Sequence, residues 1–346
     1  MSGPFQRRIR VFYPLQSGRL VLRTEGDWDR DIEPDAINSE RRISEFTVSS
    51  NHPFLYFKPF LRVGEESYRA GGMNDLAVLT ESNPRDIYPY FSSKQEGGIT
   101  PLLEVESKVL PGSHLMRIYL PAGYEENSLK RYPVIYMHDG KNLFFPEEAF
   151  LGTEWQLDET LDQLDVMSVI DKIIVVGIYA RNREEQYTMP GYDLYVQSLV
   201  DEVKPWVDSN FRTLTAPEHT GVMGSSLGGV VSFYAAWQWP HIFGRVACMS
   251  STFTFKDDLI HRVLKEPKRK IRIYLDSGWP GDNYEVTLSV CMALIERGYV
   301  FGADFLYFVF PLARHDEVSW RARCHLPLQL FNGEAVKAFR RLQSNP

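Results

Sequence analysis

The chain has 346 residues, of which 44% are hydrophobic and 13% aromatic. A chain of this length hides about three quarters of its unfolded surface on folding, so it needs no disulfide or metal for stability. Its 38 basic and 45 acidic residues give a net charge of −7. This balance disfavours nucleic acid and anionic lipid as partners.

The apolar segments and the cysteines bear on location. Charged and turn residues interrupt every apolar segment well before the ~20 residues that a membrane span requires. The N-terminal sequence MSGPFQRRIRVFYP is positively charged but lacks an apolar stretch, so we expect no secretion signal. Cys248, Cys291 and Cys324 form no CxxC pair, which predicts buried thiols in a reducing compartment. We therefore expect a cytoplasmic protein.

Residues 1–104 predict a small N-terminal β-sandwich domain. Short β-type segments, separated by turn residues, occur at residues 18–24, 45–49, 54–60 and 76–79. The sequence QEGGITP at residues 95–101 is typical of a linker.

Residues 105–346 predict an α/β domain with a mostly parallel central sheet flanked by helices, because short apolar strands alternate with helical segments. The predicted strands are residues 115–120, 132–137, 172–178, 220–223, 246–249, 271–275 and 305–310. The predicted helices are residues 155–170, 191–209, 228–239 and 284–297. Active sites in such sheets lie at the carboxyl ends of the strands.

The sequence GSSLGG at residues 224–229 is a G-x-S-x-G motif between a predicted strand and a predicted helix. This context is that of a nucleophile elbow, in which the serine occupies a tight, strained turn. Gly224 and Gly228 would remove side chains that collide across the turn. Ser226 is therefore the candidate nucleophile and Ser225 a structural neighbour, while an ordinary Gly/Ser-rich turn is the alternative interpretation.

A serine nucleophile requires a histidine base. The order Ser, acid, His is typical of this strand–turn–helix arrangement and excludes every histidine before Ser226. His241 leaves no room for the acid, and His261 lies in a predicted helix. His315, in a polar loop after the last predicted strand, is preferred to His325, which lies in the following helical segment.

The acid should follow the predicted strand 271–275. Asp282 lies in the loop after this strand and is the preferred residue, with Glu285 and Asp276 as alternatives. Its role is to orient the imidazole and stabilise its charged form.

An oxyanion hole needs two N–H donors. The amide of Leu227, which follows the nucleophile, is the first. The second is expected in the loop 138–142, where Gly140 permits a turn and the Lys141 amide is the preferred donor.

Several segments together resemble the esterase D and enterochelin-esterase-like branch of the α/β-hydrolases. They are residues 118–124, 132–144, 177–183 with Tyr187 and Thr188, 224–229 and 314–320. The resemblance implies an α/β-hydrolase fold that a β-sandwich module can precede. It also implies a serine hydrolase without metal or cofactor, with a triad of Ser226, Asp282 and His315.

The same resemblance points to residues near the substrate. Arg183 and Tyr187 align with the rim of the family's active site, and Trp320 follows the predicted base. Arg183 is a candidate for binding a carboxylate of the substrate, and a salt bridge to Glu184 or Glu185 is the alternative interpretation.

The expected activity is ester hydrolysis through an acyl-enzyme on a small-molecule substrate, such as a siderophore lactone, a sugar ester or a short-chain ester. Two other functions remain open: an acyltransferase with the same triad, and a non-catalytic binding protein on this fold. The aromatic residues Trp155, Trp237 and Trp239 fit either a core or a homodimer interface.

Overall fold

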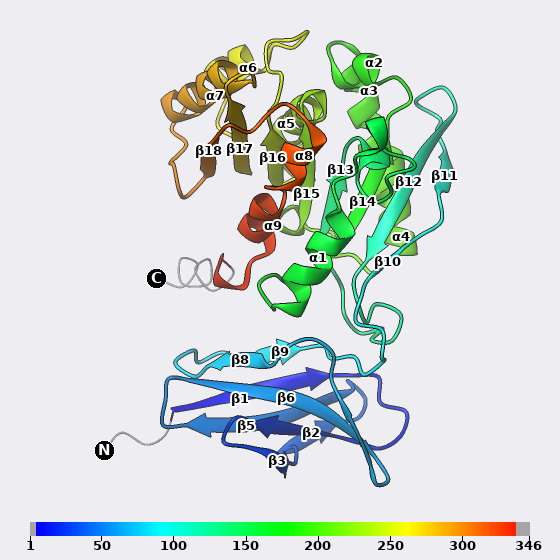
Figure 1. The fold of residues 1–346 in the computed structure, drawn as a ribbon, viewed down its shortest axis with the longest axis vertical. Helices are drawn as coiled ribbons and strands as arrows, with labels where there is room; N and C mark the ends of the chain where they lie inside the picture. Colours follow the sequence, from blue (N-terminus) through cyan, green and yellow to red (C-terminus); the bar gives the residue numbers. More distant parts are fainter. Residues whose placement is uncertain (1–4, 337–346) are drawn as a thin grey trace. The chain divides into compact units, whose positions relative to one another are not determined.

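The computed structural model describes residues 5–336, which form two units (Figure 1). The β-rich unit contains the chain up to Gly97 together with Pro121–Lys130 and Asp162–Val169. The α/β unit contains Gly98–Leu120, Arg131–Leu161 and the chain from Ile170 onward.

This division differs from a single boundary after residue 104, because a later segment packs into the β-rich unit. Glu126 accepts hydrogen bonds from the amides of Phe91 and Ser92, and the Asn127 side chain donates to the carbonyl of Phe12. The sequence pattern does not indicate that Pro121–Lys130 and Asp162–Val169 pack into the β-rich unit.

The β-rich unit consists of two sheets around one apolar core. Their strand orders are β4-β5-β1-β9 and β3-β2-β6-β7, with β8 also paired to β6. Neighbouring strands are antiparallel except β9, which runs parallel to β1. The strands are β1 (Phe5–Phe12), β2 (Arg19–Thr24), β3 (Asp27–Ile32), β4 (Ala36–Asn38), β5 (Ile43–Ser50), β6 (Phe54–Val63), β7 (Glu66–Arg69), β8 (Asp75–Val78) and β9 (Arg85–Ile87).

Two buried cations in this unit bind main-chain carbonyls. Arg7, on β1, donates to the carbonyl of Val78 and forms an ion pair with Glu81 at 2.6 Å. Lys58, on β6, donates to the carbonyl of Gly71 at 2.7 Å and to that of Met73 at 2.5 Å. Lys58 therefore stabilises the loop between β7 and β8, and Arg7 stabilises the end of β8 and the Glu81 loop that follows it.

The α/β unit is built on a sheet with the strand order β10-β12-β14-β13-β15-β16-β17-β18, to which β11 adds by pairing with β12. The strands from β13 to β18 pair in parallel, whereas β12 is antiparallel to β14. The strands are β10 (Gly98–Ile99), β11 (Leu103–Glu106), β12 (Ser113–Leu120), β13 (Val134–Met137), β14 (Ile174–Tyr179), β15 (Thr220–Ser225), β16 (Arg245–Met249), β17 (Arg272–Trp279) and β18 (Phe305–Pro311).

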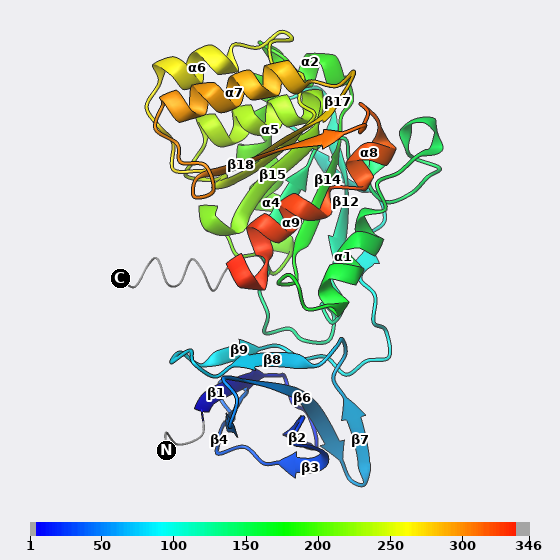
Figure 2. The same ribbon diagram turned by 60° about the vertical axis from the view of Figure 1, so that its left-hand side comes forward.

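Helices cover both faces of this sheet. Figure 2 shows α5, α6 and α7 on one face and α9 on the other. The α-helices are α1 (Leu157–Val166), α2 (Arg183–Tyr187), α3 (Gly191–Ser198), α4 (Lys204–Asn210), α5 (Leu227–Gln238), α6 (Leu259–Lys265), α7 (Tyr284–Glu296), α8 (Glu317–Arg321) and α9 (His325–Asn332). Short 3₁₀-helices are η1 (Gly140–Asn142), η2 (Phe150–Gly152) and η4 (Pro217–His219).

The helix predicted over residues 191–209 is interrupted. A π-helical turn, η3 (Leu199–Val203), separates α3 from α4, and Pro205 lies in the first turn of α4. Proline has no N–H, so the regular hydrogen-bond ladder cannot continue through it.

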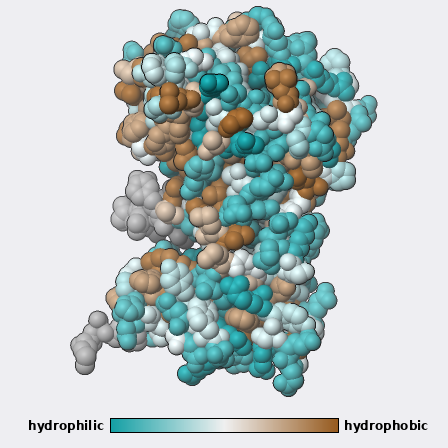
Figure 3. Space-filling model, in the orientation of Figure 1, coloured by the Kyte–Doolittle hydropathy of each residue, from teal (hydrophilic) through white to brown (hydrophobic). Residues whose placement is uncertain are grey.

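The tryptophans and cysteines singled out in the sequence are mostly buried. Trp155 and Trp237 are buried in the α/β unit, and Trp239 is half-buried. The three cysteines are free and buried. Figure 3 shows apolar side chains scattered among polar ones on the visible surface of this unit. Within residues 5–336, no helix is both long and apolar enough to cross a membrane.

Candidate active site

Ser226 lies at the junction of β15 and α5 in a strained conformation. Its φ of 54° and ψ of −124° are outside the regions that non-glycine residues normally adopt. The Ser226 amide donates to the carbonyl of Met249 on the neighbouring strand at 2.9 Å, which holds the bend in place.

The glycines of the motif are needed for space. A Cβ atom at Gly224 would lie 2.5 Å from the carbonyl carbon of Gly228, and one at Gly229 would lie 1.8 Å from the Ser251 hydroxyl oxygen. At Gly228, the Asp139 carboxylate and His138 are the close neighbours. The close approach of strand, turn and helix therefore requires glycine.

Three predicted site residues lie within hydrogen-bond distance. The Ser226 Oγ lies 3.0 Å from the Nε2 of His315, and the Nδ1 of His315 lies 2.7 Å from the Oδ1 of Asp282. In the tautomer that satisfies both contacts, His315 donates to Asp282 and accepts the Ser226 hydroxyl proton.

The second oxygen of Asp282 is also held. The Gly278 amide donates to the Asp282 Oδ2 at 2.6 Å, and the Ser250 hydroxyl donates to the same atom. Burial acts to raise the pKa of Asp282, but hydrogen bonds from His315, Ser250 and Gly278 outweigh it and hold the pKa well below its usual value.

The two alternative acids have different surroundings. Asp276 is fully buried and forms an ion pair with Arg323 at 3.1 Å, and the Tyr274 hydroxyl donates to its other oxygen. Glu285 is exposed in the first turn of α7. Of the three carboxylates considered, Asp282 is the one hydrogen-bonded to His315.

The loop after β13 positions the predicted second amide. Asp139 has a left-handed conformation in this loop, with a φ of 57°. Gly140 is needed for space, because a Cβ there would lie 2.3 Å from the main chain of Gly177 on β14. The Leu227 amide lies in the first turn of α5 and the Lys141 amide in the single turn of η1, where N–H groups have no partner within the helix.

His138 connects this loop to helix α5. The Nδ1 of His138 lies 2.8 Å from the Ser232 hydroxyl on α5, and that hydroxyl donates to the Gly228 carbonyl. Burial lowers the pKa of His138 to about 3, so the imidazole is neutral. Its position before Ser226 excludes His138 as the base in the predicted order, and no local sequence pattern indicates its contact with Ser232.

Arg183 and Tyr187 both contact Asp139. The Nε of Arg183 lies 2.9 Å from each Asp139 carboxylate oxygen, so its partner is neither Glu184 nor Glu185. Tyr187 is fully buried, and its hydroxyl accepts a hydrogen bond from the Asp139 amide. Tyr187 therefore supports the loop, which corrects its prediction as a direct substrate contact. Arg183 retains a half-exposed side chain.

Trp320 packs against the candidate base. Its ring lies 5.0 Å from that of His315 at 83°, in an edge-to-face arrangement, and 6.0 Å from that of Trp155. Only 5% of Trp320 is exposed, so it fixes the His315 ring and has little surface left for substrate.

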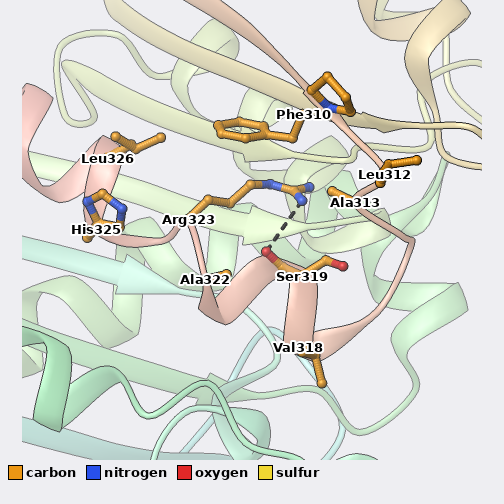
Figure 4. A pocket seen from close by; sticks show the side chains of 10 residues that line it. Phe310, Leu312, Ala313, Val318, Ser319, Ala322, Arg323, His325 and Leu326 are labelled. Atoms are coloured by element: carbon orange, nitrogen blue, oxygen red, sulfur yellow. Dashed lines mark hydrogen bonds between the residues drawn. The ribbon is translucent and has the colours of Figure 1, made fainter.

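A hollow of about 360 Å³ lies beside the loop that carries His315. Figure 4 shows the Arg323 side chain in the lining of this hollow, with a hydrogen bond to the carbonyl of Ser319. No sequence motif indicates a role for Arg323, although it lies only eight positions after His315. In the part of the chain that the structure describes, no three His, Cys, Asp or Glu residues could together hold a metal ion.

Comparison with known proteins gives a family match. The model of the Esterase family, described as putative esterase, matches residues 107–322, more than half of the chain. An uncharacterized Bacillus subtilis protein, YbbA, is 24% identical over 160 residues, which cover 42% of this chain and 60% of the relative. An endo-1,4-beta-xylanase/feruloyl esterase of Xylanibacter ruminicola is 24% identical over 267 residues, 75% of this chain and 35% of the relative. The chain thus spans less than two thirds of either relative.

Solved structures show a similar α/β-hydrolase-like fold. A ferulic acid esterase is 17% identical with a TM-score of 0.60, and the match covers 70% of this chain and 99% of the other. The enterobactin esterase of Shigella flexneri is 16% identical with a TM-score of 0.57. That match covers 96% of this chain and 94% of the other, so it includes the β-rich unit.

Proposed function

Because the chain belongs to the Esterase family, we propose that it hydrolyses carboxylic esters with Ser226 as nucleophile. The observation that carries the proposal is the contact of the Ser226 Oγ with the His315 Nε2 at 3.0 Å, on a strained bend. In this proposal His315 is the general base and then the general acid, and Asp282 orients it.

In the first half-reaction, His315 removes the hydroxyl proton as the Ser226 oxygen attacks the ester carbonyl carbon. The amides of Leu227 and Lys141 hold the negative charge that develops on the carbonyl oxygen. His315 then donates its proton to the leaving alcohol, and the acyl group remains on Ser226.

In the second half-reaction, His315 takes a proton from water as the water oxygen attacks the acyl carbon. His315 then gives this proton to the Ser226 oxygen as the bond from that oxygen to the acyl carbon breaks, which releases the carboxylic acid and restores the free enzyme. The Asp282 carboxylate stabilises the imidazolium in both steps without taking its proton. The low pKa of Asp282, which follows from its hydrogen bonds, supports this role because the carboxylate is charged at neutral pH.

The substrate class that we propose is a small ester with an aromatic or apolar group. Trp279 and Leu312 are 53% and 80% exposed at the carboxyl ends of β17 and β18, the strands that precede Asp282 and His315. The Leu312 amide donates to the Trp279 carbonyl, so the two residues are neighbours. Arg183 remains a candidate for binding a polar or anionic part of the ester.

A panel of p-nitrophenyl, feruloyl, sugar acetate and lactone esters tests the proposal on the wild-type and Ser226→Ala proteins. The variant should lose turnover and labelling by a fluorophosphonate while it keeps its fold. Unchanged turnover in the variant would overturn the assignment of Ser226. A competing alcohol that accepts the acyl group more often than water does would indicate an acyltransferase.

We also propose that the protein works in a reducing compartment such as the cytoplasm. The three free, buried cysteines support this location, because oxidising compartments favour disulfides.

A further inference from the structure

Ser250 lies directly after β16 and uses all of its polar groups to hold the acid side of the site. Its φ of 44° is unusual for a residue other than glycine. Its amide donates to the Asp276 carbonyl at 2.9 Å, and its carbonyl accepts from the Asn283 side chain at 2.7 Å. Its hydroxyl donates to Asp282. Such strain persists only where the surroundings determine it.

The hydrogen bonds at Ser250 have a fixed direction. The Nη2 of Arg323 lies 2.5 Å from the Ser250 hydroxyl oxygen, and a guanidinium can only donate. Ser250 therefore accepts from Arg323, and its own proton is directed to the Asp282 carboxylate. Free rotation of the hydroxyl is lost.

We propose that Ser250 and Arg323 are positioning residues that fix the orientation and charge of the Asp282 carboxylate. The inference rests on the proposed function, since it extends the row of Ser226, His315 and Asp282 by two further side chains. Neither residue touches the reacting atoms, and both act through Asp282.

Arg323 is held in place from three sides. Its Nε pairs with Asp276 at 3.1 Å, its Nη1 donates to the Ser319 carbonyl, and its guanidinium lies over the Phe310 ring at 5.2 Å from the centroid. Only 3% of the Arg323 side chain is exposed. A fixed, buried cation 3.8 Å from the Asp282 Oδ2 favours the ionised carboxylate.

Charged and titratable groups surround the Asp282 carboxylate on both of its oxygens. His315 faces its Oδ1, Arg323 faces its Oδ2, and Asp276 with Tyr274 lies beyond Arg323. Asp276 thus balances the charge of Arg323, so the guanidinium can be buried beside the acid without a free charge.

The test compares Ser250→Ala with Ser198→Ala, another fully buried serine, whose hydroxyl donates to a carbonyl of its own helix. The first readout is the low-field NMR signal of the His315 Nδ1 proton, which reports on the bond to Asp282 and does not depend on turnover. The signal should move in Ser250→Ala and stay in place in Ser198→Ala.

The second readout is kinetic. Loss of one hydrogen bond to a charged group should lower kcat about 10- to 100-fold in Ser250→Ala with little change in KM. The acid limb of the kcat/KM profile should move to higher pH, because Asp282 with one donor fewer attracts the imidazolium more strongly. Arg323→Lys keeps the positive charge but loses the planar guanidinium and its several donors. Its kcat should lie between that of the wild type and that of Ser250→Ala.

An unchanged His315 proton signal and an unchanged pH profile in Ser250→Ala would overturn the proposal. A wild-type protein that hydrolyses no ester would overturn the proposed function instead. In that case a shifted proton signal in Ser250→Ala would still support the positioning role.

Discussion

The buried charged groups of the two units have different roles. In the β-rich unit, Arg7 and Lys58 satisfy main-chain carbonyls at the end of β8 and in the loop before it. In the α/β unit, the buried Arg323 contacts both Asp276 and Asp282, and Asp282 is linked to Ser226 through His315. A buried charge therefore marks a functional site only where its partners lead to a reactive atom.

The largest effect is expected from Asp282→Asn, which breaks the row next to His315. The Gly278 amide and the Ser250 hydroxyl donate to one side chain atom of Asp282, so asparagine would place its oxygen there and its NH₂ group toward His315. That NH₂ group favours the wrong imidazole tautomer, and kcat should fall by about 10⁴-fold. Steady-state kinetics measure the loss, and a circular dichroism melt shows whether the fold is kept.

Lys58→Met tests the other half of the comparison. The carbonyls of Gly71 and Met73 lose their donor, and Asp75 loses a partner at 3.6 Å. We expect the free energy of unfolding to fall by about 3 kcal/mol, as for other broken buried charge contacts. Urea unfolding measures this change. A fall in kcat per folded molecule comparable to that of Asp282→Asn would contradict the comparison.

Gly224→Ala should have an intermediate effect through packing. The new methyl group would overlap the main chain of Gly228, and overpacking of this kind costs about 1–3 kcal/mol. Gly221→Ala, on the same strand, is the matched control, because its nearest neighbour would be at 3.5 Å. Thermal melts of the two variants should differ clearly, and equal melting temperatures would speak against the tight elbow.

The smallest effect concerns acid stability. The folded pKa of Asp282 lies below that of the unfolded chain, so its charge stabilises the fold above about pH 4, and this contribution is lost as the pH falls further. The melting-temperature gap between the wild type and Asp282→Asn should stay constant from pH 5 to 8 and shrink below about pH 4. A gap that widens in acid would show the opposite sign.

Local patterns predicted the parts of the molecule that depend on neighbours in the chain. The nucleophile bend could be located because its glycines lie within six positions, and Asp282 and His315 follow predicted strands. Strand β1 escaped detection because its sequence, FQRRIRVF, contains three arginines, one of which is buried against Glu81.

Contacts between distant segments could not be predicted in this way. Ser250, Asp276 and Arg323 meet only because β16 and β17 are adjacent and α8 leads Arg323 back over them. The burial of Tyr187 likewise depends on the loop of Asp139, which lies 48 positions away.

Because its three native thiols are buried, the protein is well suited to labelling at one introduced cysteine. Burial raises the pKa of Cys291 and Cys324 to about 12, and Cys248 is fully enclosed, so maleimide reagents should ignore them. Leu151 is 85% exposed. A fluorophore coupled to Leu151→Cys would therefore label a single position, and the three native cysteines would not have to be replaced first.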